Sequence, residues 1–78
     1  MNFTIYSKDY CPYCSKVIKL MQMKEFDIQV FKLGVDFSRE EFYDKFGKGS
    51  TFPQVLMGDY NSGGCTETVA YLRENKLI

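Results

Sequence analysis

Two cysteines near the N-terminus form the pattern with the clearest chemistry in this sequence of 78 residues. Cys11-Pro12-Tyr13-Cys14 places two thiols three residues apart, and residues three apart lie on the same face of a helix. The two sulfur atoms can then come within disulfide distance without much movement of the backbone. The pattern therefore predicts a dithiol that forms and breaks a disulfide.

The position of this pair assigns a role to each thiol. Pro12 suits the first position of a helix, because its missing N–H would be unpaired there in any case. Cys11 then lies where free N–H groups and the positive end of the helix dipole favour a thiolate, so its pKa should fall below the ordinary thiol range. Lys8 adds a nearby positive charge. We expect Cys11 to attack disulfides and Cys14, one turn into the helix and less exposed, to resolve the mixed disulfide.

Other kinds of cysteine chemistry fit the sequence less well. The chain has no histidine, which excludes a Cys–His catalytic pair. A zinc site would need two further ligands, and apart from carboxylates the chain offers only Cys65, so we expect no metal. A purely structural disulfide is disfavoured in the cytoplasm. Redox chemistry is therefore the preferred interpretation.

Seven short elements should position the pair, in the order β-α-β-α-β-β-α. Alternating apolar residues predict strands, apolar residues at helical spacing predict helices, and Ser38 with Glu41 forms a capping-box pattern. The predicted strands cover 3–7, 27–33, 54–57 and 60–62, and the predicted helices cover 13–25, 39–47 and 66–75. A helix between the first two strands makes them parallel, and the last two strands form a hairpin. We expect an α/β protein, with residues 1–78 forming a single domain.

Composition and charge limit the partners of this domain. Ten basic residues balance ten acidic ones, without the basic stripe that nucleic-acid binding needs. No apolar stretch approaches the roughly 18 residues of a membrane-spanning helix, and no signal-peptide pattern is present. We expect a cytoplasmic monomer that binds neither nucleic acid nor membrane. Four phenylalanines are predicted to belong to its core: Phe26, Phe31, Phe42 and Phe46.

Three separated motifs resemble the glutaredoxins, in particular the short dithiol forms of bacteria and phages. These motifs are Lys8-x-x-Cys11-Pro12-Tyr13-Cys14, Thr51-Phe52-Pro53 and Gly63-Gly64-Cys65-Thr66. The element order also matches, so the resemblance covers essentially the whole chain. It implies a thioredoxin fold, a four-stranded mixed sheet flanked by three helices. It also implies an enzyme that uses glutathione as its electron-donating co-substrate to reduce protein disulfides and glutathione mixed disulfides.

The resemblance further implies a glutathione site around the cysteines. A cis peptide bond before Pro53 would present the backbone of Phe52 to the cysteinyl unit of glutathione. The corner at Gly64 would offer the N–H groups of the following helix to the γ-glutamyl carboxylate. Lys8 would hold the glycine carboxylate, and the ring of Tyr13 would flank the tripeptide. The implied binding residues are Lys8, Tyr13, Thr51, Phe52, Pro53, Gly64, Cys65 and Thr66.

The sequence departs from the family pattern at a few of these positions. Many relatives have an acidic residue where this chain has Thr66, whose hydroxyl can instead cap the last helix, and Glu67 follows it. Relatives often have valine at the position of Phe52. Lys48 is a candidate to replace an arginine found near Gly49 in relatives. Cys65 is best interpreted as a buried, inert thiol, with a regulatory or glutathionylated thiol as the alternative.

The implied mechanism uses Cys14 only for some substrates. Cys11 alone would suffice for glutathione mixed disulfides, whereas protein disulfides, with ribonucleotide reductase as a candidate client, would need both cysteines. A redoxin reduced by thioredoxin reductase is one alternative, which Pro12-Tyr13 and Gly63-Gly64 disfavour. A carrier in which two chains share an iron–sulfur cluster through Cys11 and glutathione is another, which Cys14 disfavours.

Overall fold

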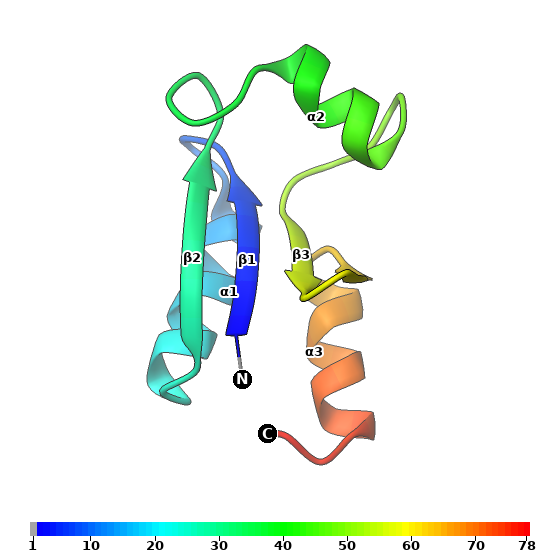
Figure 1. Ribbon diagram of the computed structural model, residues 1–78. Coiled ribbons are helices and arrows are strands. Elements are labelled where there is room, and N and C mark those ends of the chain that lie inside the picture. Colours follow the sequence, from blue (N-terminus) through cyan, green and yellow to red (C-terminus); the bar gives the residue numbers. More distant parts are fainter. Residues whose placement is uncertain (1) are drawn as a thin grey trace.

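The first strand, β1 (Asn2–Ser7), lies at the centre of the structure, a computed structural model that describes residues 2–78. The sheet has the strand order β2-β1-β3-β4, with β2 (Asp27–Lys32) parallel to β1 and β3 (Gln54–Met57) antiparallel to it. β4 (Tyr60–Gly63) pairs with β3 as the outer strand of a hairpin. Figure 1 shows β1 between β2 and β3. The predicted parallel pair and the predicted hairpin are both present.

Three helices complete the element order β-α-β-α-β-β-α. α1 (Pro12–Met23) connects the parallel pair β1 and β2, and α3 (Cys65–Glu74) follows the hairpin. α2 (Arg39–Phe46) begins at a complete capping box, in which the Ser38 hydroxyl accepts from the Glu41 N–H and the Glu41 carboxylate accepts from the Ser38 N–H. In Figure 1 α2 lies at the upper end of the molecule, above α3. The predicted thioredoxin fold is confirmed.

The main core forms between one face of the sheet and the two helices α1 and α3. Phe3 and Ile5 point to this face from β1, because side chains two apart on a strand share a face. They pack with Val17 of α1 and Leu72 of α3, all four at most 2% exposed. The predicted core residue Phe26 packs against Phe3, with ring centroids 5.4 Å apart. Burying this apolar face fixes both helices against the sheet.

A second, aromatic cluster lies on the opposite face of β1. Tyr6 points away from the main core, and its ring meets Phe31, Phe37 and Phe46 at centroid distances of 5.3, 5.0 and 5.0 Å. Phe42 of α2 is 1% exposed and joins the same cluster. The contacts of Tyr6 with Phe42 and Phe46 attach α2 to the sheet. Among residues 2–78, no helix combines the length and the apolar character that a membrane span requires.

Candidate active site

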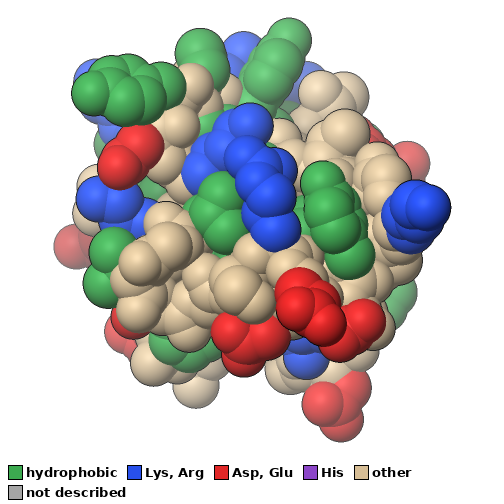
Figure 2. All heavy atoms as spheres, turned by 90° about the horizontal axis from the view of Figure 1, so that it is seen from above, with side chains coloured by type: hydrophobic (Ala, Val, Ile, Leu, Met, Phe, Trp, Pro, Cys, Tyr) green, Lys and Arg blue, Asp and Glu red, His purple; other side chains and the backbone are tan. Residues whose placement is uncertain are grey.

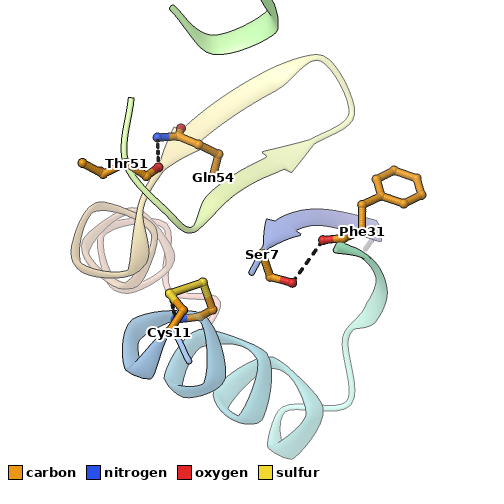
Figure 3. The surroundings of a disulfide bond; sticks show 6 residues. Ser7, Cys11, Phe31, Thr51 and Gln54 are labelled. Carbon is orange, nitrogen blue, oxygen red and sulfur yellow. Dashed lines mark hydrogen bonds between the residues drawn. A yellow bond between two sulfur atoms is a disulfide. The ribbon is translucent and has the colours of Figure 1, made fainter. Parts of the chain in front are cut away.

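The two cysteines of the Cys-Pro-Tyr-Cys motif lie at the start of α1 and form a disulfide (Figure 3). Their Cα atoms are 5.2 Å apart, within the range of ordinary disulfides. Cys11 is the N-cap of the helix, and its Sγ accepts a hydrogen bond from the Cys14 N–H at 3.2 Å. Cys11 is 8% exposed and Cys14 2%, so Cys11 is the more accessible of the two residues, as expected.

The end of β1 holds this helix start in place. The Ser7 hydroxyl donates to the Phe31 carbonyl at 3.0 Å and ties the last residue of β1 to β2 (Figure 3). The chain then turns through Tyr10, which has a left-handed φ of 55° and a fully exposed side chain. A salt bridge of 2.9 Å between Asp9 and Lys32 joins this turn to the end of β2. A short, tethered turn therefore joins the anchored end of β1 to Cys11.

The loop before β3 approaches the disulfide from the other side. The Phe52–Pro53 peptide bond is cis, as the resemblance implied, and Pro53 is buried. The Gln54 side-chain amide donates to the Thr51 carbonyl at 2.9 Å, which closes the turn around the proline (Figure 3). The cis bond leaves the backbone of Phe52 in a fixed orientation at the edge of the site.

The glycine pair forms the third wall of the site. Gly63 has a φ of 91°, which favours glycine, and a Cβ atom added there would lie 2.9 Å from the Glu67 Cβ. Gly64 is the N-cap of α3, and its N–H donates to the Glu67 carboxylate at 3.3 Å. The prediction that Thr66 caps this helix is therefore wrong. Because Gly64 occupies the N-cap position, the helix begins at Cys65 and Thr66 lies inside its first turn.

A small pocket of about 130 Å³ lies where these three segments meet. It brings together the residues implied for glutathione binding with the exception of Lys8, and adds Glu67. Its lining consists of Tyr13, Thr51, Phe52, Pro53, Gly64, Cys65, Thr66 and Glu67. The first N–H groups of α3 have no carbonyl four residues before them in the helix, so they can serve an anion here.

Lys8 stands beside this pocket and contacts it through an aromatic ring. Its Nζ lies 5.3 Å from the centroid of the Phe52 ring, a cation–π distance. The Phe52 ring in turn stacks on Phe42, with centroids 4.1 Å apart and planes at 9°. Sequence reasoning missed this link. The only signal for it was the number of aromatic residues between Phe31 and Phe52, which does not say which rings meet.

Cys65 is a free thiol buried beside the pocket, 6% exposed. Burial raises the pKa of the Cys65 thiol, which the positive charge of Lys16 partly offsets and the negative charge of Glu67 increases. The neutral thiol is therefore favoured, which agrees with the interpretation of Cys65 as an inert residue. Residues 2–78 contain no group of three or more histidine, cysteine, aspartate or glutamate side chains close enough to hold a metal ion.

The surface around this end of the molecule carries mixed charges. Figure 2 views the molecule from above, from the end where α2 lies, and shows basic, acidic and hydrophobic side chains on the same face. This mixture agrees with the formal net charge of zero. Neither positive nor negative side chains cover this face in the view.

A Cys-x-x-Cys disulfide at the start of a helix, facing a cis-proline on a thioredoxin fold, defines a thiol-disulfide oxidoreductase. Comparison with known proteins narrows this class. The chain belongs to the glutaredoxin family, whose family model matches residues 3–60.

Individual relatives agree with this assignment. The glutaredoxin of Pseudomonas aeruginosa is 36% identical over 74 residues, which cover 94% of this chain and 87% of the relative. A buckwheat glutaredoxin solved as a complex with glutathione is 30% identical, with a TM-score of 0.75, and the match covers 96% of this chain and 71% of that one. Glutaredoxin 1 from Francisella tularensis, solved with cacodylate, has a TM-score of 0.81 at 24% identity, covers 99% and 98% of the two chains, and supports the fold alone.

Proposed function

We propose that this oxidoreductase takes its electrons from glutathione and reduces protein disulfides and glutathione mixed disulfides. The observation that carries the proposal is the pocket beside the Cys11–Cys14 disulfide, built from Tyr13, the cis-proline loop and the start of α3. It offers a backbone edge at Phe52 for a cysteinyl unit and helix N–H groups for a carboxylate. A peptide thiol that ends in carboxylates fits these features.

Lys8 and Glu67 supply the remaining charges in this proposal. The ammonium of Lys8 lies at the Phe52 side of the pocket and suits the glycine carboxylate of glutathione. Glu67 lies at the Gly64 side and suits the ammonium of the γ-glutamyl unit. The glycine carboxylate and the γ-glutamyl ammonium of glutathione would thus each meet a side chain of the opposite charge.

The reaction proceeds by thiol–disulfide exchange. The Cys11 thiolate attacks the glutathionyl sulfur of a mixed disulfide, forms a Cys11–glutathione disulfide and releases the client thiol. A second glutathione attacks this intermediate, which releases oxidised glutathione and regenerates Cys11. On a protein disulfide, Cys14 attacks the mixed disulfide between Cys11 and the client, and two glutathiones then reduce the Cys11–Cys14 bond.

The clients in this proposal are disulfide-containing proteins, with ribonucleotide reductase as a candidate. We place the activity in the cytoplasm, where glutathione is kept reduced. A monomer suffices, since every proposed reacting group belongs to one chain.

The test compares the wild type with Cys14→Ser in turnover coupled to glutathione reductase. We expect the variant to keep most of its activity on a glutathione mixed disulfide and to lose activity on a protein disulfide. Cys65→Ser is the matched control, since it removes a thiol outside the exchange but keeps the backbone N–H of residue 65 that would bind glutathione, and it should keep both activities. Wild-type protein that ignored glutathione but accepted electrons from thioredoxin reductase would contradict the proposal.

A further inference from the structure

A second and larger groove runs between α1 and α3, which are in contact along the molecule. Its volume is about 530 Å³, and its floor is apolar, formed by Leu20 of α1 with Val69 and Ala70 of α3. On α1 the lining extends from Tyr13 to Met23, whose side chains are 59% and 72% exposed. At about 1.5 Å per helical residue, the groove is roughly 15 Å long. Two large apolar side chains thus lie open to solvent along it.

The rim of this groove is basic. Lys16 and Lys19 line it on α1 and Arg73 lines it on α3, and none of its described lining residues is acidic. The one salt bridge within residues 2–78 joins Lys32 to Asp9, so these three cations have no carboxylate partner there. On a chain with no net charge, three unpaired cations around an apolar floor favour a ligand that is apolar and negatively charged.

One end of the groove opens into the active site. Tyr13, Cys65 and Thr66 line both the groove and the small pocket beside the disulfide. The groove then runs away from Cys11, because α1 begins at the disulfide and its later turns form the far end. A chain whose cysteine is bonded to Cys11 can therefore place its neighbouring residues in the groove.

We propose that this groove binds a segment of the disulfide client, next to its reacting cysteine, in which acidic side chains surround apolar ones. An extended segment of about five residues spans the groove, at about 3.3 Å per residue. Its apolar side chains cover Leu20, Val69 and Ala70, and its carboxylates meet Lys19 and Arg73. This inference rests on the proposed action on protein disulfides and goes beyond it by stating the chemistry of the client.

Two disulfide-closed peptides test the proposal. One carries a tail of about five residues that alternates leucine with glutamate, and the other has lysine in place of glutamate. Each peptide is made in two versions, one with the tail on the N-terminal side of the disulfide and one with the tail on its C-terminal side. Protein reduced with dithiothreitol and then desalted is mixed with each peptide, and a single turnover is followed by quenched flow. Because glutathione is absent, this experiment can fail or succeed independently of glutathione dependence.

Wild-type protein should reduce the acidic peptide about five-fold faster than the basic one in at least one tail position. Lys19→Gln combined with Arg73→Gln should abolish most of this preference, and Ala70→Glu should reverse it. Lys24→Gln combined with Lys76→Gln is the matched control, since it removes two exposed charges that do not line the groove and should keep the preference. All variants should reduce the small neutral hydroxyethyl disulfide at the wild-type rate.

A wild type without preference would overturn the proposal, and so would a preference that survives in Lys19→Gln with Arg73→Gln. Light scattering tests the other occupant, a second copy of the chain. A dimer that dissociates on the same double substitution would show that the groove pairs two copies, and would also overturn the proposal.

Discussion

The ammonium of Lys8 lies over the ring of Phe52, 5.3 Å from its centroid. The lysine side chain is exposed and makes no salt bridge within residues 2–78, so the ring is the group that orients it. Phe52 is itself stacked on the buried Phe42. The position of a charge at the active site thus depends on the aromatic packing beneath α2.

Phe52→Val should move this charge without removing it. An exposed cation–π contact contributes about 0.5–1 kcal/mol, so we expect the KM for glutathione to rise about two- to five-fold. Lys8→Gln should raise the KM by a similar factor. If the two groups act together, the double variant should be no worse than either single variant, which steady-state kinetics with varied glutathione will show.

Phe46→Leu is the matched control for this cycle. Phe46 belongs to the same aromatic cluster and also has a lysine over its ring, Lys45 at 5.9 Å, but it does not line the active-site pocket. It should lower the thermal stability and leave the KM unchanged. Additive effects of Phe52→Val and Lys8→Gln would argue against a shared role.

The two glycines of the corner should respond differently to alanine. Gly63→Ala places a Cβ 2.9 Å from the Glu67 Cβ at a φ of 91°, so we expect a loss of about 1–3 kcal/mol in the free energy of unfolding. Gly64 has an ordinary φ of −83°, and its added Cβ would meet the Pro53 carbonyl at 3.4 Å. Gly64→Ala should therefore cost less stability but raise the KM for glutathione, because its methyl group enters the pocket. Urea unfolding and steady-state kinetics separate the two effects, and equal losses of stability would contradict the assignment.

Alkylation of Cys65 should report the charges around it. In the oxidised protein Cys65 is the free thiol, and burial raises its pKa, so its reaction with neutral iodoacetamide should be slow near pH 7 and accelerate as the pH rises. Lys16→Gln removes a charge that lowers this pKa and should slow alkylation. Glu67→Gln removes a charge that raises the pKa and should speed it, each by about two- to three-fold. Mass spectrometry gives the rates, and changes in the same direction would show that the charges do not act in this way.

The sequence predicted the local features of the site well because each depends on a few neighbouring residues. The start of α1 follows from Pro12, and the start of α2 follows from the Ser38 and Glu41 pair. The cis bond before Pro53 was implied by resemblance and is present. The element order is as expected, and the ends of the elements moved by only one or two residues.

Features that join distant segments were not predictable in this way. The contact between Lys8 and Phe52 depends on how β1 and the loop before β3 pack together, and the groove depends on the spacing of α1 and α3. The error at Thr66 has a similar origin. A threonine near a helix start suggests a cap, but the N-cap is Gly64, whose N–H donates to Glu67, and α3 begins one residue earlier than predicted, at Cys65.

The hydrogen bond from the Cys14 N–H to the Cys11 sulfur has a further consequence. In the proposed mechanism the Cys11 sulfur attacks a disulfide, and in the structure the same sulfur caps the first turn of α1. In the proposed cycle, the N-cap of α1 therefore alternates between a free Cys11 sulfur and a disulfide-bonded one. A substitution in the first turn of this helix that stabilises one of these two forms of the cap more than the other should shift the balance between the oxidised and reduced protein, even if it never touches a substrate.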